Sequence, residues 1–357
     1  MTPEFQRLMT EATRLMRGGS LHEATTAIQQ ALGTVPAAPA SADVAGRALR
    51  PDDADVIDVE ARVVGEPPAP PETAPGTAAE SFTSGHFRNE CGGRDYKLFV
   101  PAGAAQGRPL VVMLHGCTQD PDDFARGTRM NALAREQGFL VLYPAQSQRG
   151  NAQRCWNWFK HNHQGRGKGE PAILAGMVRG VIERHGVDPK RVYVAGLSAG
   201  GAMAAILGDA YPDLFAAVGV HSGLPAGSAT DVPSAFAAMN GGAQPVRRSP
   251  KTGLTPPTIV FHGDADTTVN VVNGERVLRA AGLYASPDVR RGASAMGVAW
   301  SCRPFVDAQG SVRAEEWTVH GAGHAWSGGD LAGSYTDPRG PDASAEMLRF
   351  FLRHPRG

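Results

Sequence analysis

The 357-residue sequence contains no run of about 18 apolar residues, so it provides no membrane-spanning helix. It also lacks an excess of charge: 35 basic and 35 acidic side chains leave a formal net charge of zero, which gives no general attraction to nucleic acid. The first residues, MTPEFQRLMTEATRLMRGG, do not contain the unbroken apolar segment of a secretion signal. We therefore expect an intracellular protein that neither crosses a membrane nor binds nucleic acid.

Cysteine is scarce as well. The four cysteines (Cys91, Cys117, Cys155 and Cys302) are far apart and form no C-x-x-C pair, which argues against a structural zinc site but leaves two disulfides open. Neither a phosphate-binding loop nor a dinucleotide fingerprint is present. The sequence therefore predicts no metal and no other cofactor.

Residues 1–33 and 34–80 differ in pattern from the rest of the chain. In residues 1–33, apolar side chains recur at three-to-four spacing on both sides of Gly18-Gly19, which predicts an amphipathic helical hairpin. Such a hairpin must dock on the main body, on a second copy of the chain or on another apolar surface. Residues 34–80 hold 8 Pro and 12 Ala, with 9 acidic against 3 basic side chains, which is typical of a flexible linker.

Residues 81–357 have the pattern of a doubly wound α/β domain. Two strand-like segments come first, and short apolar runs then alternate with helical stretches. The runs are Leu110–Leu114, Phe139–Tyr143, Val192–Ala195, Ala216–Val220 and Thr258–Phe261, and the helical stretches include 172–185, 199–210 and 343–353. In such sheets the chemistry lies beyond the carboxyl ends of the strands, so the residues after each run are the candidates.

A nucleophile motif follows the third of these runs. Gly196-Leu197-Ser198-Ala199-Gly200 fits the G-x-S-x-G turn between a strand and a helix, where glycine allows close backbone approach and the serine hydroxyl rises above the sheet. The helix that begins behind Ser198 points its first N–H groups at the place where an oxyanion would form. We therefore predict Ser198 as the nucleophile of an acyl-transfer reaction.

A serine hydroxyl needs a histidine base and a carboxylate that orients it, in the chain order serine, acid, histidine. Among the histidines after Ser198, His324 lies in a glycine-flanked loop after a strand-like run, Glu316–Val319. The acid is expected just after the fifth apolar run, where both Asp264 and Asp266 stand. We predict Asp266, one turn beyond the strand, and keep Asp264 as the alternative.

The first apolar run ends in His115-Gly116-Cys117-Thr118-Gln119, in the position where this arrangement supplies an oxyanion donor. We predict the backbone N–H groups of Cys117 and Ala199 as the two donors. Attack of Ser198 on an ester would release an alcohol protonated by His324, and a water activated by His324 would then hydrolyse the acyl-enzyme. The sequence thus predicts a serine esterase of the α/β-hydrolase fold.

Three further motifs carry a family resemblance. They are HGCTQ (115–119), CWNWF (155–159) and GHAWSGG (323–329). With the G-x-S-x-G turn they make residues 82–353 similar to the poly(3-hydroxybutyrate) depolymerase family of esterases. The resemblance implies Ser198, Asp266 and His324 as the triad and the Cys117 amide as an oxyanion donor. It also implies the disulfides Cys117–Cys155 and Cys91–Cys302, which would indicate an oxidising compartment.

The resemblance further implies that poly(3-hydroxybutyrate) or its oligomers are the substrate, with feruloyl or acetyl-xylan esters as the alternative. An alternative of another class is a non-catalytic granule-associated protein that merely retains the fold. The chain looks more like the intracellular members of the family. We therefore expect a cytoplasmic or granule-associated protein, with residues 1–33 as the candidate granule-binding segment. The disulfides would instead fit secretion by another route.

Aromatic side chains near these motifs are candidates for the substrate pocket. Trp156 and Trp158 lie in the long loop that follows Tyr143, and Trp326 and Ser327 come directly after the predicted base. An apolar wall beside the triad would suit a hydrocarbon-rich ester. We predict all four as substrate-binding residues, with core packing as the alternative for the tryptophans, because large aromatic side chains are normally buried.

Overall fold

The computed structural model describes residues 79–103, 106–242, 255–279, 284–286 and 288–357. The predicted helical hairpin (1–33), and all but the last two residues of the predicted linker (34–80), lie outside these residues. The chain divides into two units, residues 1–69 and 70–357. All the structure described below belongs to the second unit.

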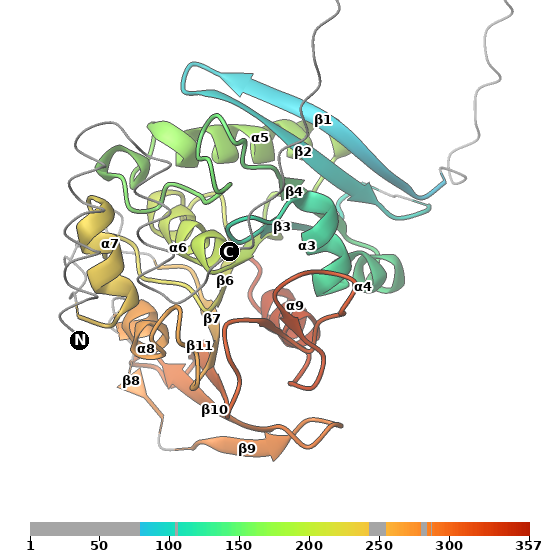
Figure 1. The fold of residues 1–357 in the computed structure, drawn as a ribbon. Helices are drawn as coiled ribbons and strands as arrows, with labels where there is room; N and C mark the ends of the chain where they lie inside the picture. The colour runs from blue at the N-terminus through green and yellow to red at the C-terminus, as the bar shows by residue number, and fades with distance from the viewer. Residues whose placement is uncertain (1–78, 104–105, 243–254, 280–283, 287) are drawn as a thin grey trace, which may run out of the picture. The chain divides into compact units, whose positions relative to one another are not determined.

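A mixed sheet forms the centre of this unit (Figure 1). Its strands are β1 (Ser81–Asn89), β2 (Gly92–Val100), β3 (Leu110–Leu114), β4 (Leu140–Pro144), β5 (Val192–Leu197), β6 (Ala217–His221), β7 (Thr258–Gly263), β8 (Tyr284–Ala285), β9 (Arg290–Ala293), β10 (Ala299–Val306) and β11 (Val312–Val319). They are ordered β1-β2-β4-β3-β5-β6-β7-β11-β10-β8, and β9 pairs with β10. From β4 to β11 the pairings are parallel, and at both edges they are antiparallel.

The buried apolar runs predicted from the sequence form the parallel strands. All residues of β3, β4, β5 and β6 are buried, as expected for strands that are covered on both faces. Strand β3 has the predicted bounds, and the strands formed by the other four apolar runs differ from them by one or two residues at their ends. The prediction of a doubly wound α/β domain is therefore confirmed.

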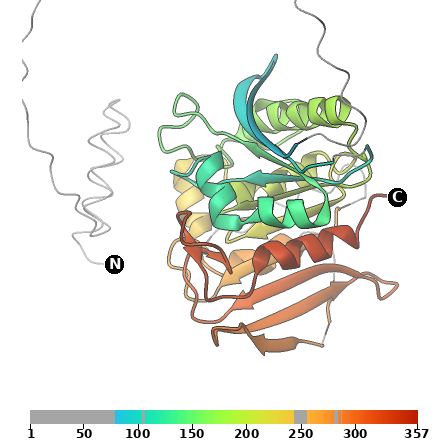
Figure 2. The ribbon, with the colours of Figure 1, turned by 90° about the vertical axis from the view of Figure 1, so that its right-hand side faces the viewer.

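Helices cover both faces of the sheet. They are α3 (Pro121–Thr128), α4 (Met130–Gln137), α5 (Gly169–His185), α6 (Ala199–Ala210), α7 (Val232–Met239), α8 (Val272–Arg279) and α9 (Ala343–Leu352), with the short 3-10 helix η1 (His161–His163). Apolar residues of α5, α6, α7 and α8 pack with one set of strand side chains, including Val112 and Val194. Those of α3, α4 and α9 pack with the alternate set, including Val111 and Tyr193. In Figure 2, α4 and α9 lie next to one another.

The antiparallel extension β8-β9-β10 has no counterpart in the predicted strand pattern. All four residues of β9 are exposed, and β8 is two residues long, so neither has the apolar run that indicates a buried strand. A separate small sheet pairs β12 (Trp326–Ser327) with β13 (Thr336–Asp337). Of the helices that the structure describes, none is long and apolar enough to cross a membrane.

The cysteine predictions have different outcomes. Cys117 and Cys155 form a disulfide with their Cα atoms 4.2 Å apart, which confirms that pair. The predicted pair Cys91–Cys302 is wrong, because Cys91 is exposed and Cys302 is buried, and both are free. Cys91 lies in the turn between β1 and β2 at one edge of the sheet, whereas Cys302 lies in β10 near the opposite edge. The order of the strands keeps the two thiols apart.

Candidate active site

The predicted triad residues follow strands that lie close together in the sheet. Ser198 follows β5, Asp266 follows β7 and His324 follows β11. In the sheet order these strands run β5-β6-β7-β11, and all of them are parallel. Their carboxyl ends therefore meet at one edge of the sheet, which is where ligands bind in such folds.

Ser198 occupies a strained turn between β5 and α6. Its φ of 56° and ψ of −118° are unusual for a residue with a side chain. A Cβ atom at Gly196 would collide with the Gly200 backbone, and one at Gly200 would collide with the Leu114 carbonyl oxygen. Both glycines are thus required by close backbone contacts, which is the physical content of the G-x-S-x-G pattern.

Asp266 and His324 form a buried pair. Asp266 Oδ2 lies 2.7 Å from His324 Nδ1, and the exposed fractions of the two side chains are 0% and 12%. Asp266 Oδ1 accepts hydrogen bonds from the N–H groups of Thr268 and Val269 at 2.9 and 2.8 Å. Burial alone would raise the pKa of Asp266, but its contacts with His262 and His324 outweigh burial and lower that pKa far below the usual range. The carboxylate is therefore charged and fixed in direction.

The alternative acid, Asp264, binds a different histidine. Its Oδ2 lies 2.8 Å from His320 Nδ1, and its Oδ1 accepts a hydrogen bond of 2.6 Å from the Gly321 N–H. Asp264 thus joins the loop after β7 to the loop after β11, and within the described residues it has no hydrogen bond to His324. This geometry favours Asp266 over Asp264 as the partner of the predicted base.

Backbone N–H groups next to Ser198 are available as oxyanion donors. Those of Cys117 and Ala199 have no hydrogen-bond partner among the described residues. Ala199 is the first residue of α6, where a helix leaves its N–H groups unpaired. A Cβ atom on Gly116 would lie 3.7 Å from Ser198 Cβ, so the loop that carries Cys117 lies against the nucleophile. No hydrogen bond links Ser198 to His324 within the described residues, and such bonds often close only when substrate is bound.

Two buried histidines, which the sequence did not single out for catalysis, support the triad. His221 Nε2 accepts a 3.0 Å hydrogen bond from the Ser327 N–H, and its carbonyl oxygen accepts one of 2.9 Å from the Ser198 N–H. His262 Nε2 donates to the Val269 carbonyl at 2.8 Å and lies 3.4 Å from Asp266 Oδ2. His221 is the last residue of β6 and His262 the last but one of β7, and this position at the carboxyl ends of parallel strands is the signal that could have identified them.

The four predicted substrate-binding side chains are buried, with exposed fractions of 0% for Trp156, 6% for Trp158, 1% for Trp326 and 2% for Ser327. Trp156 Nε1 donates to the His115 carbonyl oxygen, and Trp326 Nε1 donates to Ser344 Oγ. Ser327 Oγ donates to the Pro341 carbonyl oxygen. These side chains present almost no surface to a substrate in this structure, and for the three tryptophans this favours the packing alternative.

Tyr335 is an exposed aromatic residue that the sequence did not predict for the site. Its side-chain hydroxyl lies 3.4 Å from Thr118 Oγ1, next to Cys117, and its carbonyl oxygen accepts a 2.7 Å hydrogen bond from the Trp326 N–H. Tyr335 therefore connects the predicted oxyanion loop with the loop of the predicted base. Its exposed fraction of 48% leaves the ring accessible at this rim.

A groove of about 1700 Å³ lies elsewhere and contains no triad residue. Among its lining residues are Phe215 and Ala216, which precede β6, and Pro256 and Pro257, which precede β7. The groove therefore lies at the amino ends of the strands, opposite the edge that carries Ser198. Within the part of the chain that the structure describes, no group of three or more His, Cys, Asp or Glu side chains is arranged to hold a metal ion.

The fold is that of the α/β-hydrolase class, and Ser198, Asp266 and His324 follow β5, β7 and β11 at one edge of its sheet. Residues 94–297, more than half of the chain, match the family described as Esterase PHB depolymerase, and the chain belongs to this family. The match ends before His324, so it does not test the predicted base.

Known relatives include polyester and carbohydrate esterases. The chain is 34% identical over 239 residues to poly(3-hydroxyalkanoate) depolymerase C of Paucimonas lemoignei, covering 63% of this chain and 56% of the relative. It is 30% identical over 198 residues to feruloyl esterase B of Thermothelomyces thermophilus, covering 51% and 67%. The chain spans about half the length of the curated depolymerases it matches. An acetyl xylan esterase from Aspergillus awamori has a similar fold, with a TM-score of 0.59, 20% identity and coverage of 76% of this chain and 99% of that one.

Proposed function

We propose that the chain is a carboxylic ester hydrolase that forms an acyl-enzyme on Ser198. The observation that carries this proposal is the buried Asp266–His324 pair, which lies at the same sheet edge as a serine in a strained strand-to-helix turn. In acyl transfer by a serine nucleophile, an Asp–His pair keeps one imidazole nitrogen protonated and leaves the other free to accept a proton.

The geometry supports a two-step reaction. His324 Nδ1 donates to Asp266, so Nε2 is the nitrogen that accepts the Ser198 proton as the hydroxyl attacks the ester carbonyl. The unpaired N–H groups of Cys117 and Ala199 then stabilise the oxyanion. His324 returns its proton to the leaving alcohol, and a water that it activates hydrolyses the acyl-enzyme. Asp266 stabilises the imidazolium that forms in each step.

The first test is turnover of p-nitrophenyl butyrate. Ser198→Ala should lower kcat by at least about 10³-fold, because no other group takes over as nucleophile. A serine-directed fluorophosphonate should add to Ser198 of the unaltered protein and should not add to the Ser198→Ala variant, as read by mass spectrometry. Wild-type turnover in Ser198→Ala would refute the mechanism. Absence of turnover in the unaltered chain would favour a non-catalytic granule-associated protein.

We propose poly(3-hydroxybutyrate) or its oligomers as the preferred substrate. The family match and the 34% identity to a polyhydroxyalkanoate depolymerase support this choice. The second candidate is a feruloyl or acetyl-xylan ester, supported by the 30% identity to feruloyl esterase B. Product release from amorphous polymer granules, crystalline polymer and a feruloyl ester, measured side by side, separates the two. No hydroxybutyrate from any form of the polymer would exclude the first.

Residues 1–33 are proposed to bind the granule surface, and the chain is proposed to be cytoplasmic or granule-associated. The amphipathic pattern of these residues supports the first proposal. Deletion of residues 1–33 should weaken sedimentation of the protein with amorphous granules while turnover of p-nitrophenyl butyrate stays within about twofold. Equal sedimentation of both forms would refute this role.

A further inference from the structure

We propose that His115 is a positioning residue, which fixes the Gly116–Cys117 peptide group so that the Cys117 N–H faces the oxyanion. This inference rests on the proposed esterase function, because it concerns a donor to the tetrahedral intermediate. His115 Nδ1 lies 2.7 Å from the carbonyl oxygen of the next residue, Gly116. That oxygen and the Cys117 N–H belong to one planar trans peptide group and point in opposite directions. A group that holds the Gly116 oxygen therefore also sets the direction of the Cys117 N–H.

The contacts of His115 determine which nitrogen carries the proton. Its Nε2 accepts a 3.1 Å hydrogen bond from the Gln146 N–H and is therefore unprotonated. The proton is then on Nδ1, which donates to the Gly116 carbonyl oxygen. The side chain is 1% exposed, and burial lowers the pKa of His115 to about 4. The ring is thus neutral at neutral pH and keeps this one tautomer.

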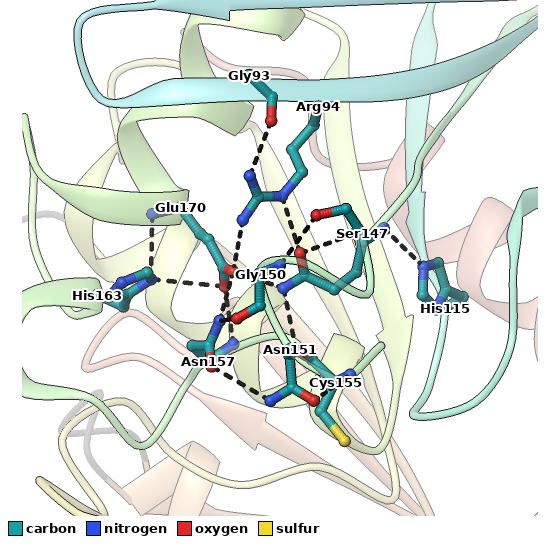
Figure 3. A network of polar contacts seen from close by, with 11 residues as sticks. Gly93, Arg94, His115, Ser147, Gly150, Asn151, Cys155, Asn157, His163 and Glu170 are labelled. Carbon is teal, nitrogen blue, oxygen red and sulfur yellow. Dashed lines mark hydrogen bonds and ion pairs between the residues drawn. The ribbon is translucent and has the colours of Figure 1, made fainter. Parts of the chain in front are cut away.

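A buried polar network holds the residue behind the ring. Gln146 Oε1 accepts a 2.8 Å hydrogen bond from Arg94 Nε, and Gln146 Nε2 donates to Glu170 Oε1 and, at 3.0 Å, to the Cys155 carbonyl oxygen. Figure 3 shows this network, with His115 at one side and Glu170 and His163 at the other. The position of the Gln146 N–H, and hence of the His115 ring, is therefore fixed from several directions.

Glu170 is the charged centre of the network. Its side chain is 1% exposed and accepts hydrogen bonds from Arg94 Nη2 at 3.0 Å and from the Asn157 N–H and Nδ2 at 2.7 Å each. Burial alone would raise the pKa of Glu170, but its contacts with His163, Gln146 and Asn157 outweigh burial and lower that pKa to about 2. Removing hydrogen-bond partners from such a buried carboxylate costs much free energy, so the side chains of this network stay in place.

Neighbouring groups of the oxyanion loop are held as well. The His115 carbonyl oxygen accepts from Trp156 Nε1 at 3.1 Å, and the Gly116 N–H donates to Gln119 Oε1 at 2.8 Å. The disulfide ties Cys117 to Cys155. In the described part of the chain these groups are bonded, whereas the Cys117 N–H is not. The polar groups beside Cys117 are thus bonded within the protein, whereas the Cys117 N–H is available to a ligand.

The test compares two replacements of His115. His115→Gln reaches toward Gln146 but removes the donor to the Gly116 oxygen, whereas His115→Asn keeps an N–H near the position of Nδ1. We expect His115→Gln to lower kcat for p-nitrophenyl butyrate roughly 10- to 100-fold, with KM within about threefold, because the lost interaction acts in the transition state. His115→Asn should lose less. Affinity for a trifluoromethyl ketone, whose Ser198 adduct carries an oxyanion, should fall by the same factor as kcat.

Val181→Ala in α5, where Val181 is 1% exposed, is the control for a general loss of stability. It should lower Tm while kcat and inhibitor affinity stay at the wild-type values.

Crystal structures of the unaltered protein and the two His115 variants show the direction of the Gly116–Cys117 peptide group directly. A wild-type peptide direction in His115→Gln, or wild-type kcat and inhibitor affinity, would overturn the proposal. Retained turnover in Ser198→Ala would instead overturn the esterase function, and the peptide direction would still decide the role of His115. If His115→Gln does not fold, His115→Ala, which also removes the donor to the Gly116 oxygen, decides by the same measurements and the same outcomes.

Discussion

Asp264 and Asp266 are two positions apart, yet they bind different histidines of the loop after β11. Asp266 Oδ2 lies 2.7 Å from His324 Nδ1, and Asp264 Oδ2 lies 2.8 Å from His320 Nδ1. The exposed fractions are 0% and 12% for Asp266 and His324 but 39% and 43% for Asp264 and His320. The buried pair Asp266–His324 can orient a base, whereas the exposed pair Asp264–His320 connects two loops.

The two aspartates should respond differently to the same substitution. Asp266→Asn should lower kcat by about 10³- to 10⁴-fold, because the amide no longer holds His324 in the productive tautomer. Asp264→Asn should keep kcat within about threefold and lower Tm slightly, since a hydrogen-bonded pair at the surface contributes at most about 1 kcal/mol. Steady-state kinetics and thermal unfolding measure both. If Asp264→Asn lowered kcat more than Asp266→Asn did, Asp264 would be the acid of the triad instead.

The cysteines can be counted with thiol reagents under non-reducing conditions. The folded protein should react at one site, Cys91, which is exposed. Cys302 is buried, and burial together with Glu315 raises the pKa of its thiol to about 12, so it should react only after unfolding. Mass spectrometry of the denatured, unreduced protein should find two labelled thiols. Four labelled thiols would contradict the Cys117–Cys155 bond, and none would contradict the two free cysteines.

Stability should fall in mild acid because of two buried neutral histidines. Burial lowers the pKa of His115 to about 4 and that of His221 to about 3. Below pH ~6.5 the unfolded chain binds protons that the folded chain does not, so each histidine removes roughly 1.4 kcal/mol per pH unit until its folded pKa is reached. Urea unfolding at several pH values between 7 and 4 measures the slope. In a folded His115→Asn variant, the free energy of unfolding should fall less per pH unit. If this slope were the same as in the wild type, the pKa of His115 would not be lowered by folding.

Much of the fold and the triad follows from local pattern. Runs such as Leu110–Leu114 are apolar throughout, because helices cover both faces of these strands. Gly196 and Gly200 mark the nucleophile turn because backbone contacts there leave no room for a side chain. The order of the strands then brings the residues after β5, β7 and β11 to one edge. Periodicity and turn chemistry are local properties, so a single sequence is enough to identify them.

The prediction that is wrong, and the contacts that the sequence did not reveal, concern residues far apart in the chain. Cys91 and Cys302 lie near opposite edges, and nothing in their spacing reveals this. Trp156 follows Cys155 in a polar loop, and its hydrogen bond to the His115 carbonyl oxygen joins it to a segment that is distant in sequence. The same holds for His115 itself, whose partner at Gln146 is 31 positions away in sequence. Such contacts are set by tertiary structure, so a motif can indicate that a residue matters without indicating what it touches.

Tyr335 should affect substrate binding more than the chemical step. Its ring is 48% exposed between the loops that carry Cys117 and His324, so an apolar acyl or alcohol group bound there would cover it. Tyr335→Ala should raise KM for p-nitrophenyl butyrate about three- to tenfold, with kcat within about twofold, because the lost contact is the same in the ground state and the transition state. Tyr335→Phe keeps the ring and should behave as wild type. Leu331→Ala, at a 75% exposed position of the same loop, serves as the matched control and should leave KM unchanged. If Tyr335→Ala and Leu331→Ala gave equal KM values, Tyr335 would have no role at the rim.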